Sequence, residues 1–173
     1  MKQDTTIMKL TDSLKTTAKL FTFSSLCYAC APVDSNIAEA RKFYGLHEEK
    51  DRKQIKELVG VDPVRTEWCA AFANAILDMR GIPGSESVSE HPLMARSFIR
   101  WGDKVEVEDI QRGDIVVFPR GDQGWQGHVG FYVNTQNDKW VVLGGNQDNT
   151  VSYGLYDPKK VIAIRRKTVD IQS

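Results

Sequence analysis

Cys69 lies near the start of a predicted helix, which makes it a candidate nucleophile. Apolar residues at positions 69, 72, 73, 76 and 77 share one helical face, and Thr66 is a suitable N-terminal cap. A thiol in the first turn of a helix lies beside unpaired backbone N–H groups, which lower its pKa and can stabilise an oxyanion. Since free cysteines are also common as small buried residues, the helix alone leaves both roles open.

A cysteine nucleophile needs a base beside it, and the chain offers three histidines. His47 lies in a polar connection, and His91 adjoins Pro92 at an expected helix start, so solvent-facing or capping roles suit them better. His128 opens a predicted strand directly after the glycine-rich segment 120–127. A histidine at the mouth of a strand beside a loop is well placed to face a cleft. We therefore prefer His128 as the base.

The elements that must position these residues change in kind along the chain. Helical patterns cover residues 34–45, 51–59, 66–80 and 92–101. Short β-rich segments separated by turn-forming residues follow at 115–118, 129–133, 140–143, 151–156 and 161–164. Because helices come first and the strands are joined by connections too short for crossovers, we expect an α+β domain with an antiparallel sheet.

Composition excludes several classes of protein. The 173 residues include 23 basic and 23 acidic side chains, a balance that argues against a nucleic-acid partner. There is no run of eighteen apolar residues, so no ordinary membrane-spanning helix is expected. Three cysteines are too few for a disulfide-dense scaffold. The length suits a single domain, which we assign to residues 34–173.

Residues 1–33 have the composition of a leader segment. They carry four lysines against two aspartates, and an uncharged stretch follows at 20–31. A basic segment followed by an apolar one is typical of a secretory signal, and a cut before Cys30 would resemble a lipoprotein signal. A disordered or frayed tail is the alternative. Cys27 and Cys30 have metal-ligand spacing, but no second pair completes a zinc site.

Five segments carry a resemblance to a known family. In chain order they are Glu67-Trp-Cys-Ala-Ala-Phe-Ala-Asn74, Ala95-Arg-Ser-Phe-Ile-Arg-Trp-Gly102, Gly113-Asp-Ile-Val-Val-Phe118, Gly127-His-Val-Gly-Phe-Tyr132 and Leu143-Gly-Gly-Asn-Gln147. Together they resemble the CHAP branch (cysteine, histidine-dependent amidohydrolases/peptidases) of the NlpC-like, papain-like cell-wall hydrolases. More narrowly, they are similar to small bacterial and phage proteins with Trp-Cys-Ala-Ala-Phe and Gly-Gly-Asn-Gln motifs. The resemblance covers residues 35–166.

The resemblance implies a papain-like fold, with N-terminal helices packed on an antiparallel sheet of about five to six strands. It implies that Cys69 is the nucleophile, His128 the base, and a polar residue on the next strand the group that orients the imidazole. Asn146 stands at that place and can accept the imidazole N–H. Gln147 and Asp148 are ranked below it.

Four residues are candidate substrate contacts: Trp68, Trp125, Gly127 and Gln147. Trp68 adjoins the nucleophile as a packing residue or a wall of the cleft, Trp125 lies in a loop that can cover substrate, and Gly127 permits close backbone approach. Gly144 stands where many relatives carry a glutamate, so a glutamate-assisted mechanism is not expected.

The resemblance predicts a peptidoglycan hydrolase that uses a Cys-His-Asn thiol mechanism. The bond is either that between muramic acid and L-alanine or one within the stem or bridge peptide. We expect no metal or cofactor and no nucleic acid, and a monomer that is exported, with or without a lipid anchor, or is phage-encoded. The alternatives are a catalytically silent wall-binding or lipoprotein module on the same fold, and an acyltransferase with the same triad.

Overall fold

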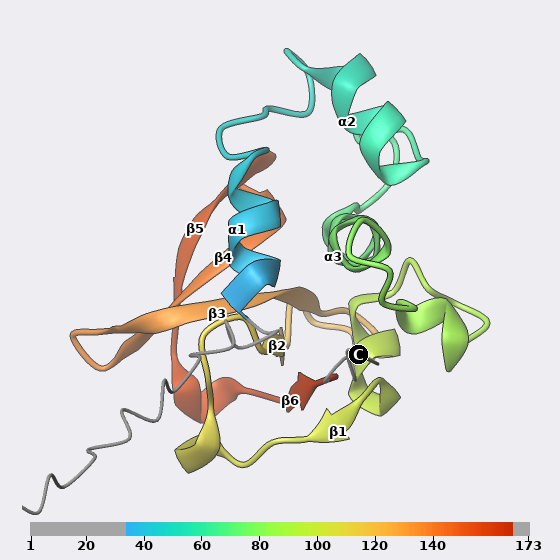
Figure 1. Cartoon of the computed structure of the whole chain (residues 1–173). Coiled ribbons are helices and arrows are strands. Elements are labelled where there is room, and N and C mark those ends of the chain that lie inside the picture. Colours follow the sequence, from blue (N-terminus) through green and yellow to red (C-terminus); the bar gives the residue numbers. More distant parts are fainter. Residues whose placement is uncertain (1–33, 168–173) are drawn as a thin grey trace, which may run out of the picture.

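A computed structural model describes residues 34–167, which form helices gathered on one side of a six-stranded sheet (Figure 1). The helices are α1 (Asp34–Arg41), α2 (Arg52–Val59) and α3 (Cys69–Asp78). The strands are β1 (Asp103–Lys104), β2 (Ile115–Phe118), β3 (His128–Gln136), β4 (Lys139–Gln147), β5 (Thr150–Tyr156) and β6 (Ala163–Arg166). Their order across the sheet is β1-β6-β2-β3-β4-β5, with antiparallel neighbours. The predicted α+β class and antiparallel sheet are confirmed. Within residues 34–167, no helix has the length and apolarity that crossing a membrane requires.

The sheet separates two apolar cores because strand side chains alternate between its faces. On β2, Ile115 and Val117 join the larger core beneath the helices, which includes the buried Phe72 of α3. Val116 and Phe118 point to the other face and join a smaller core. The helices therefore cover one face, and a second aromatic-rich cluster covers the opposite face.

Two helical predictions are corrected by the structure. Helix α3 begins at Cys69, with Trp68 rather than Thr66 at the N-cap position, so the cysteine is the first helical residue. The segment after Pro92 forms a short 3₁₀ helix over Ala95–Arg100 instead of an α-helix. Its turns close by hydrogen bonds three residues apart, as between the Ser97 N–H and the Met94 carbonyl, 2.9 Å.

The C-terminal end of β4 is irregular, which matters for the site. The register between β4 and β5 shifts between Gly144 and Gln147, and Asn146 has a left-handed backbone, with φ of 56°. An extra residue in one strand bends it and re-aims its side chains. This bulge also brings the backbone of Gly145 against the start of α3: a Cβ there would lie 2.6 Å from a ring carbon of Trp68 and 2.7 Å from the Cβ of Phe72.

Gly145→Ala therefore forces α3 away from the sheet. Overpacking of this kind costs about 1–3 kcal/mol of the free energy of unfolding, measured by urea denaturation. Gly124→Ala is the matched control, because a Cβ there meets open space and the expected change is within about 0.5 kcal/mol. Equal effects of the two substitutions would contradict this close packing.

Candidate functional site

Cys69 is almost fully buried, with 3% of its surface exposed, at the start of α3. It lines a pocket of about 350 Å³ together with Glu67, Leu93, Met94, Ala95, Arg120, Gly121, Trp125, Gln126 and Gly127. Burial raises the pKa of the thiol, while the backbone N–H groups of Val129 and Ala70 and the charge of Arg120 partly oppose that rise. The thiol is therefore protonated at neutral pH.

His128 is also buried, with 3% of its surface exposed, at the first position of β3. Burial, aided by the charge of Arg120 and opposed by Gln147, lowers its pKa to about 3. Its Nε2 has no hydrogen-bond partner among the residues that the structure describes. A Cβ on Gly144 would lie 3.3 Å from this nitrogen and 3.5 Å from Nε2 of Gln147. Both nitrogens therefore lie near Gly144.

Cys69 and His128 line two different pockets that share Arg120. His128 lines a second pocket of about 350 Å³ with Asn146, Gln147, Tyr156 and their neighbours, and Arg120 lines both pockets. Val129, the residue after the histidine, contributes the N–H that acts on the thiol. With the pKa of the thiol raised and that of the imidazole lowered, the pair rests as neutral thiol and neutral imidazole.

Asn146 forms hydrogen bonds with Glu67, which lies two residues before α3, and with Arg120. Its side-chain Nδ2 donates a hydrogen bond of 2.6 Å to the Glu67 carboxylate, and its backbone carbonyl accepts one of 3.3 Å from Arg120. Arg120 also donates to Glu67, at 3.2 Å. The contact found for the Asn146 amide nitrogen is therefore with Glu67, and its role in orienting His128 stays a prediction.

Gln147 belongs to the interior of the site. Its Nε2 donates to the carbonyls of Val142, Gly144 and Ser152. Its Oε1 accepts a hydrogen bond of 2.7 Å from the hydroxyl of Tyr156. Because three carbonyls hold the nitrogen, the amide orientation is defined, and the oxygen is the end that Tyr156 contacts.

The other candidate contacts differ in exposure. Trp68 is fully buried; its Nε1 donates to Glu48 at 3.1 Å, so it packs in the core and offers substrate no surface. Trp125, 60% exposed, and Gly127 both line the thiol pocket.

Sequence reasoning missed Glu67, Arg120 and Tyr156. The only available signal was the position of Glu67, two residues before the cysteine.

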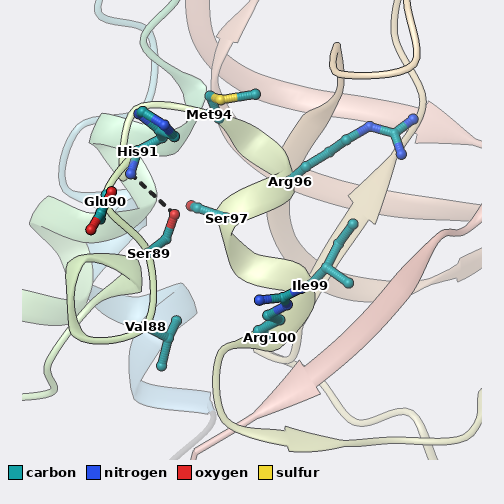
Figure 2. A pocket seen from close by; sticks show the side chains of 9 residues that line it. All are labelled: Val88, Ser89, Glu90, His91, Met94, Arg96, Ser97, Ile99 and Arg100. Atoms are coloured by element: carbon teal, nitrogen blue, oxygen red, sulfur yellow. Dashed lines mark hydrogen bonds between the residues drawn. The ribbon is translucent and has the colours of Figure 1, made fainter.

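The two remaining histidines lie outside both pockets. His47 accepts a hydrogen bond of 3.2 Å from the Glu49 N–H. His91 lines a separate pocket of about 540 Å³ beside the 3₁₀ helix, where its backbone N–H donates to Ser89 (Figure 2). Within residues 34–167 no group of His, Cys, Asp and Glu side chains could hold a metal ion. The predicted leader, with Cys27 and Cys30, lies outside the described residues.

Arg120→Gln should raise the thiol pKa, because the guanidinium charge favours the thiolate and its loss also leaves the Glu67 carboxylate uncompensated. We expect the pH midpoint of Cys69 alkylation, followed by peptide mass spectrometry, to move upward. Arg52→Gln, which removes an exposed ion pair with Asp62, should leave the midpoint unchanged. A midpoint that stays or falls in Arg120→Gln would show that Arg120 does not act on the thiol.

Comparison with known proteins finds a likeness in structure only. No family model and no curated protein sequence matches the chain. It is similar to NlpC1 from Trichomonas vaginalis, with 22% identity and a TM-score of 0.52 over 82% of this chain and 46% of that one. For NlpC2 from the same organism the values are 20%, 0.51, 82% and 48%. An NlpC/P60 family protein from Bacillus cereus ATCC 10987 has 16% identity and a TM-score of 0.49, over 79% of this chain and 40% of that one.

The chain spans less than half of each of these structures. At such identities the likeness concerns the fold alone. The predicted papain-like, NlpC-like architecture is confirmed by the two Trichomonas proteins, and the narrower resemblance to the CHAP branch stays a prediction. The chain has the α+β fold of the NlpC proteins.

Proposed function

We propose that this protein is a cysteine-dependent amidase or peptidase that cleaves an amide bond in peptidoglycan. The observation that carries the proposal is the placement of the Cys69 thiol at the first residue of a helix, in a pocket, beside the backbone of the residue that follows His128. A thiol, an imidazole and unpaired helix N–H groups are the parts that thiol catalysis of acyl transfer requires.

The reaction starts from the neutral pair. As the substrate carbonyl enters, His128 takes the proton of the Cys69 thiol, and the sulfur attacks the carbonyl carbon. The N–H groups at the start of α3 have no partner within the helix and stabilise the oxyanion. The imidazolium then protonates the leaving amine, and the C–N bond breaks. The neutral imidazole next takes a proton from water, whose oxygen attacks the thioester and releases the carboxylic acid and the thiol.

Two residues are candidates for orienting His128. Asn146 is the residue that the sequence resemblance assigns. Gln147 is favoured by its contacts, since its side chain opposes the lowering of the His128 pKa and lies beside Nε2 across Gly144.

Acyl transfer to an amine is a second candidate reaction. The observation that favours it is the burial of both reacting groups, each 3% exposed, because a dry site slows hydrolysis of the thioester. Products analysed in the presence of an amine acceptor separate the reactions: a new amide indicates transfer, and a free carboxylate indicates hydrolysis. Action on the cell wall also requires export, which we propose from the leader-like composition of residues 1–33.

Purified protein incubated with peptidoglycan should release fragments with new amine and carboxylate ends, identified by mass spectrometry. Cys69→Ala and His128→Ala should each lower the rate by about 10³-fold or more, as losses of a nucleophile or its base do. Arg52→Gln, which removes an exposed ion pair with Asp62 away from both pockets, is the control and should keep the wild-type rate. Tight binding to several wall types without turnover would instead indicate a silent wall-binding module.

Gln147→Ala should lower kcat more than Asn146→Ala does. Misplacement of a reacting group by about 1 Å can cost about 100-fold in rate, and Gln147 is the residue beside the imidazole nitrogen. Asn146→Ala should act through loss of the hydrogen bond to Glu67, with a smaller decrease in kcat. Steady-state kinetics on one soluble muropeptide decides between them, and the reverse order would assign the orienting role to Asn146.

A further inference from the structure

Tyr156 contacts both the imidazole of His128 and the amide beside it. The two rings are parallel, with an interplanar angle of 1° and centroids 5.4 Å apart. The hydroxyl of Tyr156 donates a hydrogen bond of 2.7 Å to Oε1 of Gln147. One side chain from β5 therefore contacts both the imidazole of His128 and the amide oxygen of Gln147.

The ring of Tyr156 also packs against a second aromatic side chain. It stacks on Phe118 with centroids 4.6 Å apart and an angle of 25°. Phe118 lies directly opposite His128 in the register of β2 and β3, so the two side chains emerge on the same face of the sheet. The aromatic stack thus joins the end of β5 to the ends of β2 and β3.

Two glycines clear the space in which these groups meet. A Cβ on Gly154 would lie 2.5 Å from Oε1 of Gln147 and 2.7 Å from a ring carbon of Tyr156. A Cβ on Gly144 would lie 3.3 Å from Nε2 of His128. Any larger residue at position 154 would displace either the Gln147 amide or the Tyr156 ring, so their contact requires glycine there.

We propose that Tyr156 is a positioning residue for His128, which holds the imidazole by ring stacking and holds the Gln147 oxygen by its hydroxyl. Stacking restricts the rotation of the imidazole about its side-chain bonds, and the hydroxyl bond restricts the amide. The catalytic consequence rests on the proposed function, whereas the positioning itself does not.

The two contacts can be separated by substitution. Tyr156→Phe removes the bond to Gln147 and keeps the stack, and Tyr156→Leu removes both. Tyr132→Phe is the matched control: this tyrosine is also buried on the sheet, and its hydroxyl pairs with Thr135 at 2.9 Å. Far-ultraviolet circular dichroism establishes which variants fold.

Steady-state kinetics supplies the first measurement. Tyr156→Phe should lower kcat by about tenfold and Tyr156→Leu by about 100-fold, with KM within about twofold, because positioning acts on the reacting groups rather than on substrate binding. Tyr132→Phe should match the wild type. Effects of Tyr156→Phe no larger than those of Tyr132→Phe, or effects on KM alone, would overturn the proposal. If Tyr156→Leu does not fold, Tyr156→Phe decides.

Nuclear magnetic resonance of the His128 imidazole supplies a measurement that needs no turnover. The charged or titratable groups that line the pocket of this ring include Arg120 after β2, Asp148 after β4 and Tyr156 of β5. Loss of the stacked ring admits water, so Tyr156→Leu should raise the His128 pKa from about 3 towards its ordinary value. An unchanged pKa in folded Tyr156→Leu would overturn the positioning role. Failure of the wild type to cleave wall material, with the pKa shift present, would reject the proposed function and leave the positioning intact.

Discussion

The close contact between the start of α3 and the bulged end of β4 sets the geometry of the whole site. Gly145 lets the backbone of β4 reach Trp68 and Phe72. That approach brings Asn146 to Glu67 and leaves Gln147 turned into the interior, where it meets Tyr156. The start of α3, which carries Cys69, is thereby joined to the end of β4, and His128 begins β3, the strand that pairs with β4.

Burial of the reacting groups follows from this packing and determines their charge. A thiol and an imidazole removed from water both favour their neutral forms, which agrees with the direction of both pKa shifts. The positive charge of Arg120 lowers the pKa of both groups. It therefore favours the thiolate form of Cys69 and disfavours the imidazolium form of His128. In the reaction that we propose, the thiolate–imidazolium pair forms only with substrate present, when the proton moves from sulfur to nitrogen and on to the leaving amine.

The sequence was informative where the signal is local. Helical spacing located α3, β-rich segments located β2 to β6, and the residue types of Cys69 and His128 pointed to thiol chemistry. The cap was misplaced by two residues, because apolar spacing does not distinguish Thr66 from Trp68 as the last non-helical position. The partners of Asn146 and Gln147 depend on a bulge and on residues far away in the chain, such as Glu67, which is 79 positions from Asn146. No periodicity encodes such contacts, so Tyr156 could not be recognised before the fold was known.

The proposed mechanism requires a covalent acyl intermediate on Cys69. Protein mixed with soluble muropeptide and quenched in acid within the first turnovers tests it most directly, with mass spectrometry of the peptide that contains Cys69. We expect an adduct with the mass of the acyl fragment on this peptide in the wild type and none in Cys69→Ala. Release of the same fragments at an undiminished rate by Cys69→Ala would contradict it.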